Sequence, residues 1–278
     1  MSRNDPETAE YWENQDLRDS VSIRQVKSLL PEYKRMSLGS MERHRDVVQK
    51  LATVAGGGPL EQLRNLLVSY EGVAFGAAHN YNRFWDFVVQ NIRHLREMGI
   101  STVYLESVRD DAHQELVDSY LATGAMSDEL RSFVKRYDAG WNVSGRGLEM
   151  FLDVAWRSGI RVRGVDGRPA RKRNLGIDNA EQSVFLRAAT MNSYCAQVIR
   201  EDRSSGCHGK YLVELGEAHT GFHPGPPVGF QFDGAHFETT DEYPGVDGIL
   251  QIPAVGFTSD MNLTALSPSH RERNTSSF

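Results

Sequence analysis

Short apolar runs alternate with amphipathic stretches of helical period along most of the chain. The apolar runs predict buried strands at 72–75, 101–105, 161–165, 210–215 and 248–252. Between them, apolar residues recur every three or four positions and predict helices at 61–70, 84–98, 112–136, 147–157 and 180–201. A strand, a helix and a second strand in succession indicate parallel strands joined by right-handed crossovers.

This alternation predicts an α/β fold, a three-layer domain with a mainly parallel central sheet flanked by helices. We assign the domain to residues 61–266. Residues 1–60 have a helical pattern after about 20 polar positions, and a glycine run at 56–58 ends this N-terminal segment. The polar residues 267–278 are expected to form a disordered tail. Residues 220–244, rich in Gly, Pro, His and Phe, predict a long ordered loop of the kind that covers binding sites.

Composition narrows the class of protein. With 40% hydrophobic and 24% charged residues, the 278-residue chain is globular rather than disordered or fibrous. A formal net charge of −6 disfavours a nucleic-acid partner. No apolar stretch approaches the ~20 residues of a membrane helix, and the polar start does not resemble a signal peptide. We therefore expect a cytoplasmic protein without membrane insertion; the oligomeric state is left open.

Residues with catalytic chemistry follow directly after the predicted strands. They are His79, Glu106, Asp166 and His219. Because the carboxyl ends of parallel strands meet at one edge of a sheet, these side chains are expected to face one crevice. Imidazole and carboxylate bind divalent metals, and without a metal they act as general base and acid. His79, Glu106 and His219 are therefore candidate catalytic residues and also candidate ligands of Mn, Zn, Co or Fe.

Several of these residues also have a structural interpretation. His79 could cap the helix that follows it, and Glu106 could form an ion pair with Arg109. Asp166 could fix the turn at 165–167 by an Asx hydrogen bond. Cys195 fits a small core residue on its helix, and no histidine at a convincing spacing marks it as a nucleophile.

Four segments in this order resemble the superfamily that joins the erythromycin esterases, the haem-uptake ChaN proteins and the Tiki/TraB proteases. The segments are 75–79, 102–106, 187–192 and 215–221, and the resemblance spans about residues 70–255. It implies a hydrolase-like crevice of His79, Glu106 and His219, with Arg187 nearby. Glu217 is expected to supply a further acid. The remaining positions are candidates for substrate binding: Asp166, Arg109, His223, Tyr81 and Phe222.

The main hypothesis is a hydrolase-type enzyme that acts on an ester, lactone or amide bond of a mid-sized organic or peptide-derived substrate, or a lyase or cyclase derived from one. Its partner would be a small molecule or a peptide. A first alternative is a ChaN-type protein that binds haem or another cofactor through Tyr81, Tyr104 or His223. A second is a toxin- or effector-like interaction protein, in which residues 1–60 serve for docking.

Overall fold

A computed structural model describes residue 29 and residues 57–77, 83–140, 147–167, 179–206, 208–224, 229–232, 235–237, 242–257 and 263–265. Most of the predicted N-terminal helical segment and the whole predicted tail lie outside these residues, so both stay predictions. The domain boundaries at 61 and 266 stay predictions for the same reason.

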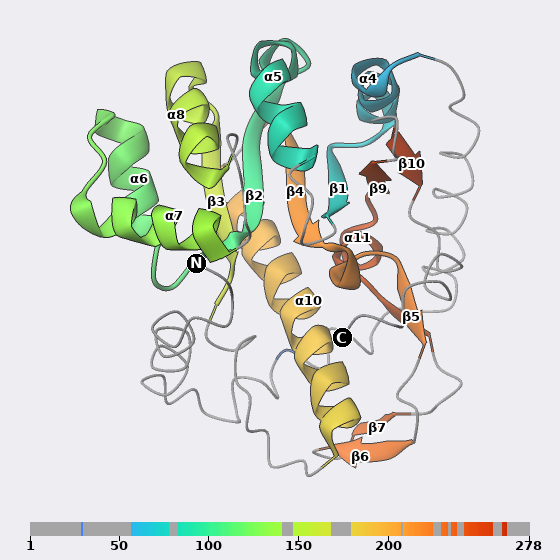
Figure 1. The fold of residues 1–278 in the computed structure, drawn as a ribbon. Helices are drawn as coiled ribbons and strands as arrows, with labels where there is room; N and C mark the ends of the chain where they lie inside the picture. The colour runs from blue at the N-terminus through green and yellow to red at the C-terminus, as the bar shows by residue number, and fades with distance from the viewer. Residues whose placement is uncertain are drawn as a thin grey trace.

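The described residues form a six-stranded central sheet of order β10-β9-β1-β4-β2-β3 (Figure 1). Its strands are β1 (Gly72–Ala77), β2 (Ile100–Arg109), β3 (Arg161–Asp166), β4 (Lys210–Gly216), β9 (Ala254–Phe257) and β10 (Leu263–Ala265). Neighbouring strands are parallel except for the antiparallel pair β9–β10. This confirms the predicted α/β class with a mainly parallel sheet.

Helices cover both faces of the sheet, and the strand residues divide between them by alternation. On one face, Val73, Val103 and Leu212 pack against the first group of helices, whereas Ala74 and Tyr104 pack against the second. The first group is α4 (Pro59–Ser69), α5 (Arg83–Glu97), α6 (Gln114–Thr123), α7 (Asp128–Gly140) and α8 (Leu148–Ser158). The second is α10 (Ala180–Ser204) and α11 (Val246–Leu250). Figure 1 shows the long α10 running from beside the strands toward β6 and β7, away from α5 and α8.

Two sequence predictions of single elements are wrong. The helix expected at 112–136 is two helices, because the chain takes a left-handed conformation at Gly124 (φ 72°), which ends α6. The strand expected at 248–252 is part of α11, which a left-handed Gln251 ends; the fifth parallel strand is β9. Short apolar runs do not distinguish a buried strand from a buried helical turn.

The predicted loop at 220–244 contains short strands in its described part. They are β5 (Phe222–Pro224), β6 (Phe230–Phe232), β7 (Ala235–Phe237) and β8 (Glu242–Pro244). β5 pairs with β8 and β6 pairs with β7, both antiparallel. The segment therefore folds back on itself rather than running as a single loop.

The connections after β1 and β4 leave the sheet on opposite faces. The chain after β1 enters α5, whereas the chain after the neighbouring β4 leads to α11. Adjacent parallel strands whose connections diverge in this way open a crevice beyond their carboxyl ends, where ligands of such sheets bind. The fold therefore places the expected site at the ends of β1, β4 and β2.

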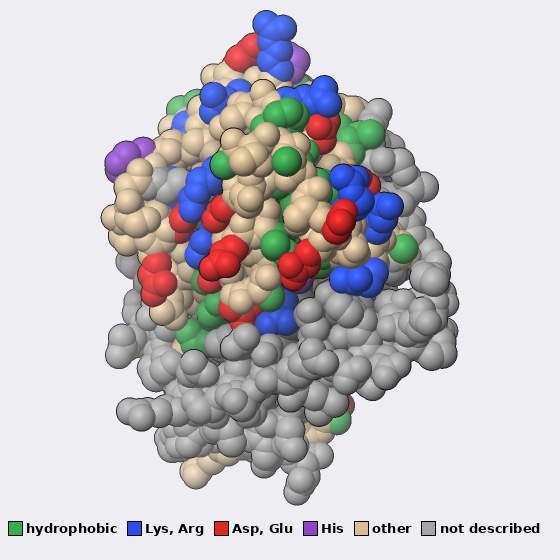
Figure 2. Space-filling model, turned by 90° about the vertical axis from the view of Figure 1, so that its left-hand side faces the viewer, with side chains coloured by type: hydrophobic (Ala, Val, Ile, Leu, Met, Phe, Trp, Pro, Cys, Tyr) green, Lys and Arg blue, Asp and Glu red, His purple; other side chains and the backbone are tan. Residues whose placement is uncertain are grey.

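The face that contains α6, α7 and α8 carries basic and acidic side chains interspersed (Figure 2). Ion pairs account for part of this mixture, including Arg157 with Asp153 at 3.1 Å and Arg131 with Glu149 at 3.7 Å. Such exposed pairs contribute little stability. They leave the visible described surface of this face without a dominant sign of charge.

Gly164 is expected to be sensitive to any added side chain, because it pairs with β2 where the register between the strands shifts, between Leu105 and Arg109. A Cβ at this position would clash with the Val108 carbonyl oxygen, which is backbone and cannot rotate away. We expect Gly164→Ala to lower the free energy of unfolding by about 2 kcal/mol or more. Gly58→Ala, whose Cβ would meet nothing within 4 Å, should cost less than about 1 kcal/mol. Equal losses in denaturant titrations of the two variants would contradict this account.

Candidate acid–base site at the strand ends

Glu106 and His219 meet beyond the carboxyl ends of β2 and β4. Glu106 belongs to the last part of β2, and His219 ends the short 3₁₀ helix η1 (Glu217–His219) that follows β4. His219 Nε2 lies 3.7 Å from Glu106 Oε1, and the two side chains are 17% and 22% exposed. The pair is thus held in the protein yet open to a reactant. The sequence placed both residues at this edge; His79 and Tyr81 lie outside the described residues.

The second carboxylate oxygen of Glu106 is held by the backbone. Gly216 N–H donates to Glu106 Oε2 at 2.5 Å. The register between β2 and β4 runs as far as Leu105 and Glu214, so the carboxylate bridges the two strands just beyond their last pairing. A charge-assisted hydrogen bond of this kind fixes the carboxylate plane and leaves Oε1 directed at His219.

The segment that carries His219 is anchored on both sides. Thr220 Oγ donates to the Glu217 carbonyl at 3.0 Å. The next residue, Gly221, donates its N–H to Asp247 Oδ1 at 2.8 Å, and Asp247 is fully buried in α11. The imidazole itself contacts α10, where His219 Nδ1 lies 2.8 Å from Asn192 Oδ1. These contacts hold the imidazole in one orientation.

Glu214 is a second carboxyl group near the site, and sequence reasoning missed it. It lies on the face of α7, opposite the face of Glu106, and is only 7% exposed. Burial raises its pKa to about 8, and the charge of Glu106 adds to the increase. Hydrogen bonds from the backbone of Glu106 and Ser107 act in the other direction. The signal was present in the sequence, since Glu214 interrupts an otherwise apolar strand.

Tyr137 of α7 lies on the same side as Glu214. Its pKa is raised well above the usual value by burial and then by the charges of Glu214 and Glu106. The hydroxyl therefore stays protonated at neutral pH and can only add to the polar surroundings of the two carboxyl groups as a neutral group. Neither Glu214 nor Tyr137 was among the residues that the sequence singled out for function.

Asp166 and Arg109 make structural contacts at the ends of β3 and β2. Asp166 Oδ1 accepts from Gly167 N–H, the next residue of the turn, at 2.7 Å. Arg109 is 3% exposed and pairs with Asp111 at 3.0 Å. Glu106 is engaged by Gly216 and His219 instead. Substrate binding by Asp166 or Arg109 stays a prediction.

The other candidate residues are only partly placed. Glu217 is half-buried in η1, next to the site, and Arg187 is exposed on α10. His223 and Phe222 lie in β5, but the description covers only their backbone. The roles predicted for these four residues stay predictions.

The described side chains bear on the metal and haem binding expected from the sequence. The described residues contain no group of three or more His, Cys, Asp or Glu that could hold a metal ion. Glu106 Oε1 and His219 Nε2 would be two donors, and His79 would have to supply a third. Tyr104, one of the haem ligands considered, is fully buried and donates its hydroxyl to Asp202 at 2.8 Å. A divalent metal therefore stays a prediction that depends on His79.

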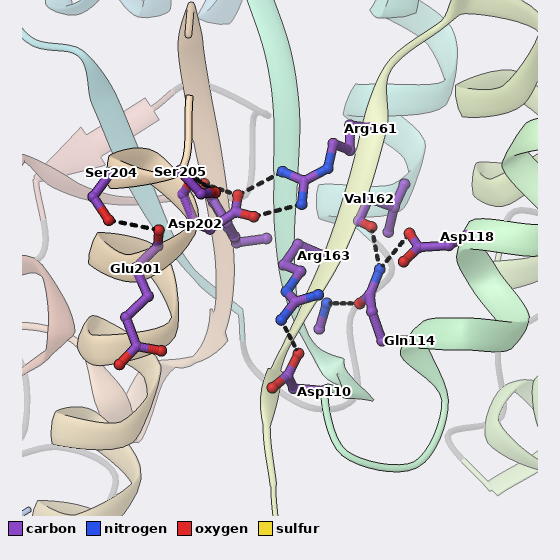
Figure 3. Close-up of polar contacts among 12 residues, drawn as sticks. Asp110, Gln114, Asp118, Arg161, Val162, Arg163, Glu201, Asp202, Ser204 and Ser205 are labelled. Atoms are coloured by element: carbon purple, nitrogen blue, oxygen red, sulfur yellow. Dashed lines mark hydrogen bonds and ion pairs between the residues drawn. The ribbon is translucent and has the colours of Figure 1, made fainter. Parts of the chain in front are cut away.

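The network around Asp202 anchors α10, the helix that carries Asn192. Arg161 of β3 pairs with Asp202, and Arg163 of the same strand pairs with Asp110 (Figure 3). On the outer side of β3, the Gln114 side chain accepts from Gly164 N–H at 2.7 Å and donates to the Val162 carbonyl at 2.9 Å. The side chain thus satisfies backbone groups on the edge of the sheet.

A cavity of about 400 Å³ opens at the opposite, amino edge of the sheet. Arg161 and Asp202 line it together with Ser101, Ser205 and His208. Because Asp202 neutralises Arg161, the cavity offers no free charge from this pair. We therefore place the candidate site at the carboxyl edge, where Glu106 and His219 meet, rather than in this cavity.

Cys195 cannot serve as a thiolate nucleophile in this fold. It is fully buried on α10, and burial raises the pKa of its thiol well above the usual value. Cys207 lies outside the described residues.

Within the described ranges, no helix is both long and apolar enough to cross a bilayer.

The fold is an α/β domain in which a glutamate and a histidine meet at a topological switch point of the sheet. No protein-family profile matches the chain. In sequence, it is 29% identical over 182 residues to a multifunctional-autoprocessing repeats-in-toxin protein of Vibrio vulnificus. The match covers 65% of this chain and 3% of that very long protein.

Solved structures with a similar fold are also toxin domains. RRSP, a MARTX toxin effector domain from Vibrio vulnificus, superposes with a TM-score of 0.69 at 21% identity, over 95% of this chain and 48% of that one. The C-terminal region of Pasteurella multocida toxin, described as having a thiol-protease-like catalytic triad, gives 0.64 at 14% identity, over 88% of this chain and 31% of that one. The chain thus spans about half or less of the length of each of these three proteins.

These findings correct the resemblance drawn from the sequence. The matches are bacterial toxin effector domains rather than erythromycin esterases, ChaN proteins or Tiki/TraB proteases. The motifs behind the resemblance are loose: a glycine and then a histidine after a buried strand provide a turn and a polar side chain in any parallel sheet. They indicated the correct fold class, but they identified the wrong family.

Proposed function

We propose that this chain is a toxin effector-type domain that acts enzymatically, with His219 as its general base and Glu106 as the carboxylate that stabilises the protonated imidazole. The observation that carries the proposal is the Nε2–Oε1 approach of 3.7 Å at the switch point of the sheet. The similarity to a Vibrio vulnificus toxin supports the effector part. This similarity favours the toxin- or effector-like protein, the second alternative from the sequence, over a metabolic enzyme.

The geometry suits hydrolysis of an ester or amide bond. His219 Nε2 accepts a proton from water as the water oxygen attacks the carbonyl carbon, and the imidazolium then returns the proton to the leaving group. The Glu106 carboxylate stabilises the imidazolium between these steps, because opposite charges attract strongly in a partly buried site. Gly216 N–H keeps that carboxylate in place.

The proposed place of action is the cytosol of a target cell, and the proposed substrate is a peptide or small molecule found there. Producing the chain inside eukaryotic cells from an inducible promoter tests this directly. We expect growth to stop after induction of the wild-type chain. Cells that accumulate soluble, folded protein and grow at the rate of the empty-vector control would contradict the proposal.

A further inference from the structure

Asn192 is a polar residue within a run of buried residues, 189–193, of the helix α10, and asparagine is a poor helix former. It is fully buried on α10. Both ends of its amide have partners from distant parts of the chain. Nδ2 donates to the Pro244 carbonyl at 3.2 Å, and Oδ1 lies 2.8 Å from His219 Nδ1. The residue therefore joins three segments: α10, the end of η1 and the end of β8.

These partners settle which way the amide points. The Pro244 carbonyl can only accept a hydrogen bond, so the amide nitrogen must face it. The opposite orientation would bring two carbonyl oxygens together within the protein and leave both unsatisfied. Oδ1 of Asn192 therefore faces His219.

The same reasoning sets the proton on His219. Oδ1 can only accept, so His219 Nδ1 must carry the hydrogen. In the neutral imidazole the other nitrogen, Nε2, then has the free lone pair. Nε2 is the nitrogen that faces Glu106 and the crevice.

We propose that Asn192 is a positioning residue that holds His219 in the Nδ1–H tautomer and so presents Nε2 as the acceptor at the site. The inference rests on the proposed function only where Nε2 is given the role of base. Asn192 touches no reactant itself. Its effect on any reaction passes through the imidazole.

A second contact helps to keep Asn192 and His219 in the same relative position. The Gly245 N–H, next to Pro244, donates to the Gly221 carbonyl at 2.5 Å. The segment after η1 and the segment before α11 are thus tied to each other as well as to Asn192. The position of Asn192 Oδ1, the acceptor for His219, is therefore fixed by several hydrogen bonds between these segments.

Nitrogen NMR of histidine-labelled protein tests the tautomer without any substrate. The His219 signals are assigned by their loss in His219→Ala. In the wild-type chain we expect neutral His219 to show a protonated Nδ1 and an unprotonated Nε2. Asn192→Ala should return the ring to a mixture of both tautomers. Asn192→Asp, whose carboxyl group can accept from Nδ1 through one oxygen and, when protonated, donate to the Pro244 carbonyl through the other, should restore protonated Nδ1.

The results separate positioning from mere stability. Asn192→Ala is expected to slow growth arrest in cells at least 10-fold, and Asn192→Asp to recover at least part of that loss. A wild-type His219 protonated on Nε2, or an unchanged tautomer in folded Asn192→Ala, would overturn the proposal. If Asn192→Ala does not fold, the wild-type tautomer alone decides. If wild-type His219 is protonated on Nδ1 but cells that produce the folded chain keep growing, only the proposed function is refuted.

Discussion

His219→Ala is expected to reduce the rate at which the chain arrests cell growth by about 100-fold or more, while the protein stays folded. Removal of a general base typically costs a factor of 10²–10⁴. The side chain is 17% exposed and lies at the edge of the sheet rather than in the core, so its loss leaves no large cavity. The rate of arrest after matched induction, together with thermal melting of the purified variant, measures both parts of the prediction.

Two further variants make this test specific. Glu106→Gln keeps the size of the side chain but removes the charge that stabilises the imidazolium, and we expect a loss of similar order. His208→Ala changes an exposed histidine at the opposite edge of the sheet and should behave as wild type. An active His219→Ala, or a His208→Ala as impaired as His219→Ala, would contradict the assignment of the base.

Glu214 is expected to make the stability of the protein depend strongly on pH. Its pKa is about 8 in the folded protein against 4.5 for an ordinary glutamate. Between these values the folded state binds a proton that the unfolded state has released. The contribution of this group to the free energy of unfolding should therefore be constant below about pH 4.5 and fall by about 3–5 kcal/mol as the pH rises to about 8.

Urea titrations from pH 5 to pH 9 measure this effect against Glu214→Gln, which cannot ionise. The stability of the variant relative to wild type should increase with pH and level off above pH 8. Glu97→Gln, whose carboxylate side chain is 57% exposed, is the matched control and should follow the wild-type curve. Parallel curves for wild type and Glu214→Gln would mean that Glu214 is already charged in the folded protein.

The strands and most helices were predictable because the spacing of apolar residues along the sequence reflects which side chains are buried. The run at 210–215 is apolar since β4 is central and covered on both faces, and the period of 84–98 matches the buried side of α5. The break at Gly124 and the helix α11 were not predictable in the same way. The break depends on a single left-handed residue. The helix α11 is a short apolar run whose periodicity does not distinguish a helix from a strand.

The meeting of Glu106 and His219 follows from a topological rule, since both come after parallel strands. The roles of Asn192 and Glu214 do not follow from such a rule. Asn192 acts through Pro244 and His219, and Glu214 through the backbone at the end of another strand. Contacts between segments so far apart leave no periodic signal, although a polar residue in an apolar element marked both positions.

The central claim is that this domain carries out an acid–base reaction on a component of a target cell. Incubating the purified chain with an extract of eukaryotic cells, and comparing the products by mass spectrometry with those from His219→Ala, tests it most directly. The account predicts peptides or small molecules with newly hydrolysed bonds that form only with the wild-type chain. Identical product profiles from the two folded proteins would contradict it.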